Sequence, residues 1–467
     1  MLSVLFLILF VNLRLAYGLD SGHDPEINMT TIQMAQWWGY KEANIVYAQT
    51  EDGYLLEMHH IPYGRNGAGK DGKPRPVVFM QHGLQAASDC FTWNLPNESL
   101  ALIFADYGFD VWLGNVRGNR YSNKHVSLSP SNKTFWEFSW DEMVKYDLDA
   151  MIDTVLNKTN TSSLYYIGHS QGTLIMFSKL ASDPNFHTKI NAFFALAPVG
   201  TVKDIEGLTG FLAGPLFLES DILLDILGDG EFLPQSWVTE LMSEYICSND
   251  AKKRKREAPH IFEDGQELCD NILFQIMGPN SLQLNTSRTP VYLDHVPAGT
   301  STQNMMHWIQ MVHSGLQQAY DYGTPAKNMA HYGSSRTPVY LDHVPAGTST
   351  QNMMHWIQMV HSGLQQAYDY GTPAKNMAHY GSTTPPIYNI SNVNAPTYLF
   401  YSDLDWLADL KDVTSHILAN LNPNILKGNF FIEKFNHADF VLGLRAADEI
   451  FHPIAKIIQD DFNSQGK

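Results

Sequence analysis

The stretch "LYYIGHSQGT", Leu164–Thr173, predicts a buried strand that turns sharply into a helix. Its first residues are apolar, and residues Gln171–Ser182 have the period of a helix. Ser170 is the serine of a G-x-S-x-G pattern, which arises by chance in roughly one chain of this length in six. Between a strand and a helix, however, the pattern is typical of a nucleophile elbow, which lifts a serine hydroxyl above a sheet. Its glycines allow close packing around the turn, and the helix N-terminus favours developing negative charge.

Other apolar runs also have the length of buried strands. They are Pro76–Gly83, Phe109–Asn115, Asn191–Val199, Pro396–Asp405 and Asn429–His437. Helical stretches such as Trp140–Leu156 lie between many of them, and this alternation predicts a mostly parallel α/β sheet. The pattern lapses after residue 199, where the apolar region Gly207–Trp237 follows. We therefore expect a mainly helical cap at residues 200–395, inserted between core segments at residues 19–199 and 396–467.

A serine hydroxyl needs a base to remove its proton, and histidine oriented by a carboxylate is the usual base. In sheets of this type the chain order is serine, acid, histidine, with each residue at a strand end. Asp405 closes one predicted strand and His437 closes the next, which makes them the candidate acid and base. The acids that compete with Asp405 are Asp403, Asp409 and Asp412.

Preorganised backbone N–H groups are the usual donors to the oxyanion formed during acyl transfer. One should come from Gln171, the residue after the nucleophile, and one from the loop that follows an earlier strand. The sequence "QHGL", Gln81–Leu84, ends such a strand, so we expect Leu84 to supply the second N–H. No His/Cys cluster has zinc spacing, and we expect neither a metal nor another cofactor.

The N-terminus and the composition indicate a protein of the secretory pathway, bound for the extracellular or digestive lumen or for the lysosome. Residues Met1–Gly18 have the apolar run and small-residue end of a signal peptide, and no later stretch approaches the ~18 apolar residues of a membrane span. The formal charge of −18 argues against a nucleic-acid partner. N-x-S/T sequons, the acceptors of N-glycosylation, occur at Asn28, Asn97, Asn132, Asn157, Asn160, Asn285 and Asn389.

Three cysteines allow at most one intrachain disulfide. Cys247 and Cys269 are the pair nearest in sequence and therefore the candidate bridge. Cys90 would then be free, and we interpret it as a small buried hydrophobe.

Several long stretches resemble the acid lipase family, which contains gastric lipase and lysosomal acid lipase. Among them are "WWGYKEANIVYAQTEDGYLLEMHHIPYG", "DVWLGNVRGNRYS", "FWEFSWDEMVKYDLDAMID", "GHSQGT", "PAGTSTQNMMHW", "DWLADLKDV" and "NHADF". Together they span nearly the whole mature chain. The resemblance implies an α/β-hydrolase fold with a catalytic triad of Ser170, Asp405 and His437, and oxyanion amides at Leu84 and Gln171. It also implies an apolar lid in the cap, and hydrolysis of triacylglycerols or sterol esters at a lipid–water interface at acidic pH, by a monomer.

The chain departs from this family in two places. The insertion Ala251–Glu267 separates Cys247 from Cys269 more widely than the family does, so the bridge remains a hypothesis. The 48 residues Ser287–Ser334 recur without substitution as Ser335–Ser382, whereas the family has the segment once. Two identical copies are not a solenoid. Because they are identical, a fold can use the start of one and the end of the other.

Two other functions are compatible with these residues. An esterase for small soluble esters would use the same triad, although the long apolar cap argues against it. A hydrolase-fold protein that binds lipid without catalysis would be expected to lack part of the triad.

Overall fold

The computed structural model describes residues 26, 29–67, 74–207, 278–279, 281–285, 288, 352, 355 and 364–466. The strands are β1 (Asn44–Gln49), β2 (Tyr54–Ile61), β3 (Val77–Gln81), β4 (Asp110–Gly114), β5 (Lys124–His125), β6 (Leu164–His169), β7 (Ile190–Leu196), β8 (Thr397–Tyr401) and β9 (Leu426–Phe431). The α-helices are α2 (Thr31–Trp37), α3 (Leu100–Asp106), α4 (Trp140–Glu142), α5 (Leu148–Thr159), α6 (Gln171–Ser182), α17 (Pro373–Tyr380), α18 (Leu410–Asp412), α19 (Asp439–Leu442) and α20 (His452–Ser464).

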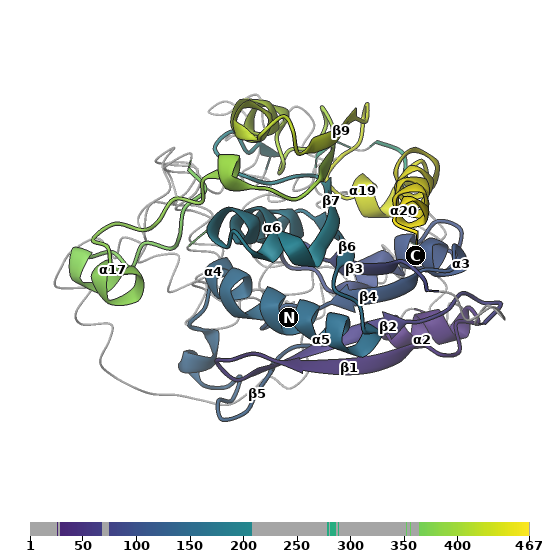
Figure 1. Cartoon of the computed structure of the whole chain (residues 1–467), viewed down its shortest axis with the longest axis horizontal. Coiled ribbons are helices and arrows are strands. Elements are labelled where there is room, and N and C mark those ends of the chain that lie inside the picture. The colour runs from purple at the N-terminus through teal and green to yellow at the C-terminus, as the bar shows by residue number, and fades with distance from the viewer. Residues whose placement is uncertain are drawn as a thin grey trace, which may run out of the picture.

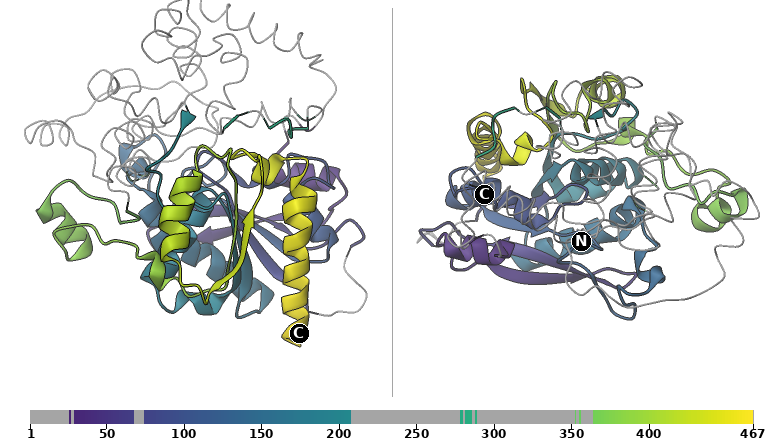
Figure 2. Two further views of the ribbon diagram at one scale, coloured as in Figure 1. Left: turned by 90° about the horizontal axis from the view of Figure 1, so that it is seen from above. Right: turned by 180° about the vertical axis from the view of Figure 1, so that it is seen from behind.

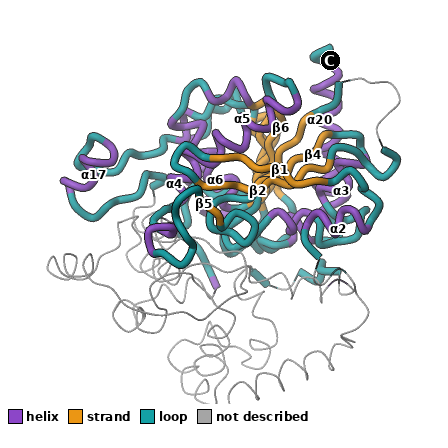
Figure 3. Tube along the Cα trace, turned by 90° about the horizontal axis from the view of Figure 1, so that it is seen from below, coloured by secondary structure: helices purple, strands orange, loops and turns teal. Residues whose placement is uncertain are grey.

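All of these strands belong to one twisted sheet, in the order β1-β2-β4-β3-β6-β7-β8-β9, with β5 paired to β2. From β4 to β9 every neighbouring pair is parallel, whereas β1, β2 and β5 pair antiparallel. Helices lie on both sides of the sheet (Figures 1 and 3). The mostly parallel α/β sheet predicted from the sequence is thereby confirmed.

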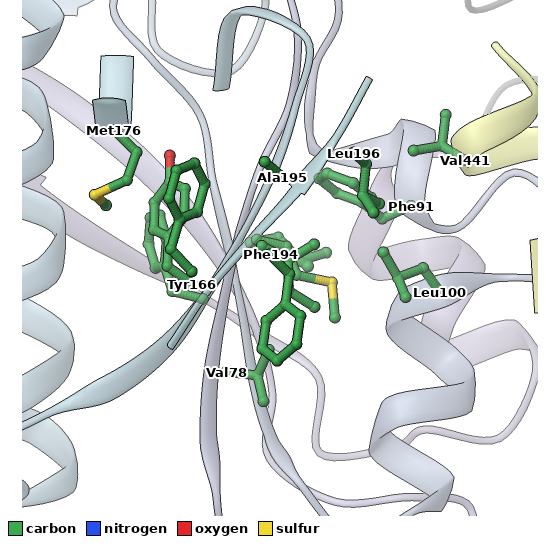
Figure 4. Close-up of a cluster of buried hydrophobic side chains, with 14 of the residues drawn as sticks. Val78, Phe91, Leu100, Tyr166, Met176, Phe194, Ala195, Leu196 and Val441 are labelled. Atoms are coloured by element: carbon green, nitrogen blue, oxygen red, sulfur yellow. The ribbon is translucent and has the colours of Figure 1, made fainter. Parts of the chain in front are cut away.

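The core follows from strands that are apolar on both faces. Every residue of β3 and β6 is buried, as expected for central parallel strands covered by helices. Figure 4 shows Tyr166 and Met176 on one side of these strands, and Phe91, Leu100 and Val441 on the other. These side chains belong to one continuous hydrophobic cluster. The carboxyl end of β6 is therefore held rigidly, and Ser170 follows it directly.

The strands predicted from apolar runs are all present but shorter, β7 and β9 begin earlier than predicted, at Ile190 and Leu426, and α6 has the predicted bounds of Gln171–Ser182. One detail was wrong, because neither Asp405 nor His437 lies at a strand end. Strand β8 stops at Tyr401 and β9 at Phe431, and both side chains lie in the loops that follow. Ser402 begins this departure from the sheet, since its Oγ accepts hydrogen bonds from the N–H groups of Leu404 and Phe435.

Strands β7 and β8 pair directly although some 200 residues separate them in the sequence, from Leu196 to Thr397. The predicted cap would occupy this interval, most of which lies outside the described residues. The α-helix α17, within this interval, stands away from the layers of the sheet in every view (Figures 1 and 2). The signal peptide, Asn28, Cys247 and Cys269 also lie outside the described residues.

The duplicated segment contributes to the described structure from both of its copies. Arg288 of the first copy is buried, and its guanidinium lies 2.8 Å from both carboxylate oxygens of Glu26. From the second copy come Asn352, His355 and the continuous run from residue 364 onward, which leads back to β8. The described fold therefore takes the start of one copy and the end of the other.

Candidate active site

The turn between β6 and α6 holds Ser170 in a conformation that non-glycine residues rarely adopt, with φ 53° and ψ −120°. A side-chain carbon on Gly168 would lie 2.7 Å from the backbone of Gly172, and one on Gly172 would lie 2.4 Å from the carbonyl oxygen of Gln81. Both glycines of the pattern are thus required by close backbone contacts. The N–H of Ser170 donates to Leu196 on β7 at 3.1 Å, which ties the turn to the sheet.

The loop after β9 carries His437 and the loop after β8 carries Asp405. The Nδ1 atom of His437 lies 2.9 Å from each carboxylate oxygen of Asp405. Oδ1 of this carboxylate also accepts hydrogen bonds from the N–H groups of Leu407 at 3.0 Å and Ala408 at 2.8 Å. Both side chains are buried. Because Nδ1 donates to the carboxylate, Nε2 is the ring atom left to act as a base.

The three competing acids have other partners. Asp403 accepts from the N–H of Lys434 at 2.8 Å. Asp409 caps α18 through the N–H of Lys411, and Asp412 accepts from the N–H of Asp204 at 2.9 Å. Of these acids, only Asp405 has a recorded contact with His437 in the described part of the chain.

His169, which the sequence did not predict as a site residue, connects the turn at Ser170 to the loop that carries His437. Its Nε2 lies 3.0 Å from the carbonyl oxygen of His437, to which it donates, and the two rings have centroids 4.9 Å apart. Burial lowers the pKa of His169 to about 3, so it stays neutral in mild acid. The only sequence signal was its place beside Ser170, since its partner lies 268 positions away.

The predicted oxyanion loop after β3 lies against Ser170. A side-chain carbon on Gly83 would come within 2.9 Å of the Cβ of Ser170, so only glycine fits there and the chain passes directly beside the serine. Leu84 is the next residue of this loop, and Gln171 is the first residue of α6. The N-terminus of a helix favours negative charge, which suits Gln171 for oxyanion binding.

His82 anchors this loop, and the sequence did not predict its role. Its Nδ1 donates to the Gly83 carbonyl at 2.8 Å, while its Nε2 accepts from the N–H of Val116 at 3.3 Å and from Asn119 at 3.1 Å. Burial lowers the pKa of His82 to about 4, so the acceptor nitrogen persists at acidic pH.

The other predicted modification and binding sites are placed as follows. The side chains of Asn97, Asn132, Asn157, Asn160 and Asn389 are exposed. Asn285 is half-buried, and its amide donates to Glu98 at 2.8 Å. Cys90 is a free, buried thiol, as predicted.

Among the residues described, His, Cys, Asp and Glu side chains form no cluster suited to a metal ion. Nor do the described ranges contain a helix long and apolar enough to cross a membrane.

Comparison with known proteins shows to which family this chain belongs. A partial alpha/beta-hydrolase lipase region matches residues 31–95, and the alpha/beta hydrolase fold matches residues 76–213. Lipase lipl-1 of Caenorhabditis elegans is 44% identical over 98% of both chains. Human gastric triacylglycerol lipase is 38% identical over 94% of this chain and 92% of its own. Human lysosomal acid lipase/cholesteryl ester hydrolase is 37% identical over 93% of this chain and 92% of its own. The chain belongs to the acid lipase family of the α/β-hydrolase fold.

Proposed function

We propose that the protein is a lipase, a serine hydrolase that cleaves the carboxylic esters of neutral lipids, triacylglycerols or sterol esters, at acidic pH. The supporting observation is the strained turn at Ser170, whose neighbour His169 bonds to the backbone of His437, a buried histidine bound through Nδ1 to both oxygens of Asp405. Gastric and lysosomal lipases are homologous over almost the whole chain, and their names supply the substrate class.

In the first half of the reaction, Nε2 of His437 takes the proton of the Ser170 hydroxyl as the serine oxygen attacks the ester carbonyl. The carbonyl oxygen becomes negatively charged and accepts hydrogen bonds from the backbone N–H groups of Leu84 and Gln171. The carboxylate of Asp405 stabilises the imidazolium that has formed. This imidazolium then gives its proton to the departing alcohol, and the fatty acyl group remains bound to the serine oxygen.

In the second half, water replaces the alcohol. His437 removes a proton from the water, which attacks the acyl carbonyl, and the same two N–H groups bind the new oxyanion. When this intermediate collapses, the imidazolium returns a proton to the serine oxygen and the fatty acid leaves. Every proton taken by the imidazole is returned, so the cycle requires no metal or other cofactor.

Operation in acid requires that the histidines near the imidazolium do not become positively charged. His169 lies against His437, and a positive charge there would oppose the imidazolium. Burial lowers the pKa of His169 to about 3 and that of His82 to about 4, so both stay neutral in a mildly acidic solution. The site thus suits an acidic compartment.

We propose further that the protein is an N-glycosylated monomer of the secretory pathway that acts at the surface of lipid particles.

The function is tested by labelling the purified protein with a serine-directed fluorophosphonate, with Ser170→Ala as the control. We expect labelling of the parent protein only. Hydrolysis is then compared on emulsified triacylglycerol, emulsified sterol ester and a dissolved short-chain ester, in mildly acidic and neutral buffer. Activity confined to the dissolved ester would instead indicate a small-ester esterase. Folded protein that neither labels nor hydrolyses would be a silent lipid-binding member of the fold.

A further inference from the structure

Part of the second duplicated copy is bound along the helix that begins after the nucleophile. Gln365 donates from Nε2 to the Leu174 carbonyl at 3.3 Å and to the Ser178 hydroxyl at 2.8 Å. Asn352 donates from Nδ2 to the side-chain oxygen of Gln171 at 2.9 Å. The contacted positions 171, 174 and 178 recur at the spacing of one helix face. Asn352 and Gln365 of the second copy therefore contact a single face of α6, and Asn352 contacts the first residue of that helix.

His355 fixes the same segment to the neighbouring helix α4. Its ring stacks on Trp140, with centroids 3.5 Å apart and planes inclined by 9°. Its Nε2 lies 2.6 Å from the Gln366 carbonyl, and its Nδ1 lies 3.1 Å from the Ser139 hydroxyl. Burial lowers the pKa of His355 well below its usual range, so the ring is neutral. Asn352 and His355, three positions apart in the second copy, thus contact the two helices α6 and α4 respectively.

The contact with Gln171 lies one residue from the reacting serine. Gln171 is buried, and its side chain is held between Asn352 and Met143, whose sulfur lies 3.5 Å from the Gln171 Nε2. The backbone N–H of this same glutamine is the oxyanion donor in the proposed mechanism. Because the terminal amide of Gln171 is bound on both its oxygen and its nitrogen, the side chain restrains its own backbone, and the contact limits the directions in which that N–H can point.

We propose that Asn352 is a positioning residue for the reaction: by holding the Gln171 side chain, it orients the Gln171 N–H toward the oxyanion. The inference rests on the proposed function, since it requires an oxyanion at this N–H. Loss of one oxyanion donor costs about 10²–10³ in kcat. A donor that is present but poorly oriented should cost less, about 10-fold or somewhat more, with little change in KM because the ground-state ester does not depend on it.

The test compares Asn352→Ala with Asn304→Ala on a dissolved ester. Asn304 occupies the corresponding position of the first copy, within the same 48-residue sequence, so the two variants differ only in which copy is altered. We expect kcat to fall about 10-fold in Asn352→Ala and to be unchanged in Asn304→Ala. Gln365→Ala removes a contact to the far part of α6 and should lower thermal stability without this loss of kcat.

A double-mutant cycle separates positioning from general loosening of the fold. Gln171→Ala keeps the backbone N–H but removes the side chain on which Asn352 acts. If Asn352 acts through that side chain, adding Asn352→Ala to Gln171→Ala changes kcat no further. Asn352→Asp adds a pH readout, because the introduced carboxyl can donate to Gln171 only when protonated. Its kcat relative to the parent should therefore recover as the pH is lowered.

Several results would overturn the proposal. They are full kcat in folded Asn352→Ala, additive losses in the cycle, an equal loss of kcat in Gln365→Ala, or a loss that appears only when Asn304 and Asn352 are both replaced. The last result would mean that either copy can serve. Failure of the proposed function looks different, because the parent protein itself would then not react with the fluorophosphonate, and the positioning role would fall with it.

Discussion

Replacement of Arg117 by methionine should destabilise the fold strongly. The guanidinium is 1% exposed and lies between two carboxylates. Its Nε donates to the buried Asp147 at 2.7 Å, and its NH1 and NH2 donate to Asp52 at 2.5 and 3.0 Å. Its carbon centre also lies 4.2 Å from the ring centroid of Tyr54. Methionine is shorter but has a similar volume and an unbranched apolar stem, so the change removes the charge while keeping much of the packing.

The expected loss follows from what remains at each carboxylate. Asp147 is fully buried. Of the donors that Arg117 supplies to it, the substitution leaves only the backbone N–H, at 3.0 Å. Removal of one partner of a buried ion pair costs about 3–5 kcal/mol. Asp52 is 27% exposed, so water can replace its partner at little cost. The free energy of unfolding should therefore fall by about 3–5 kcal/mol, from a typical total of about 5–15.

Urea unfolding followed by tryptophan fluorescence measures this difference, provided that the m value is unchanged. The matched control is Arg445→Met, because Arg445 and Glu449 form an exposed ion pair with side chains 43% and 37% accessible. That change should cost less than about 1 kcal/mol. The unpaired Asp147 should also favour its protonated form in the folded variant, so the deficit should shrink in acid. A loss for Arg117→Met no larger than the control would refute the reasoning.

Three further results are expected. Asp405→Asn should lower kcat by about 10⁴, because its amide would stabilise the wrong tautomer of the catalytic imidazole, whereas Asp403→Asn should leave kcat nearly unchanged; equal effects would contradict the assigned roles. Burial raises the pKa of Asp412 to about 7, so between about pH 4 and pH 7 the folded state keeps a proton that the unfolded state releases. The stability that this group contributes therefore falls as the pH rises from about 4 to about 7. Asp412→Asn should flatten this slope in pH-dependent melting, and an unchanged slope would contradict it. Deletion of Ser335–Ser382 leaves one copy of every duplicated residue and removes a loop-closure cost of about 3 kcal/mol; the shortened enzyme should keep its activity and melt no earlier, and unfolding on deletion would exclude this view.

The elements around Ser170 could be predicted closely because local sequence determines them. An apolar run, two obligatory glycines and a helical period coincide there, and the observed bounds of β6 and α6 follow this pattern. Strands β1 and β2 were not predicted. Strand β1 lies at the sheet edge with mostly exposed side chains, and β2 contains Glu57 and His59, which look unsuited to a core. Those two side chains form a hydrogen bond between Nε2 of His59 and Oε1 of Glu57 at 3.0 Å, and Nδ1 of His59 also forms a hydrogen bond with the Ser88 hydroxyl.

The candidate site was harder to predict where its contacts depend on the tertiary fold. Chain order pointed to Asp405 and His437, although the strand ends used to select them were misplaced. His169, His82 and Asn352 gave no comparable signal, because each acts on a partner in another segment. A polar residue bound to a distant backbone atom or side chain has no periodicity of its own, so only the folded chain identifies it.

The backbone at Ser170 has a consequence for how this chain can evolve. Holding a non-glycine residue in such a conformation costs about 1–3 kcal/mol, and glycine would adopt it without that strain. Folding alone therefore favours replacement of the serine. In a library screened only for expression, glycine should accumulate at position 170, whereas growth on a lipid as the sole carbon source should retain serine. Under the proposed function, a serine at this position therefore reflects selection for catalysis, acting against the preference of the backbone.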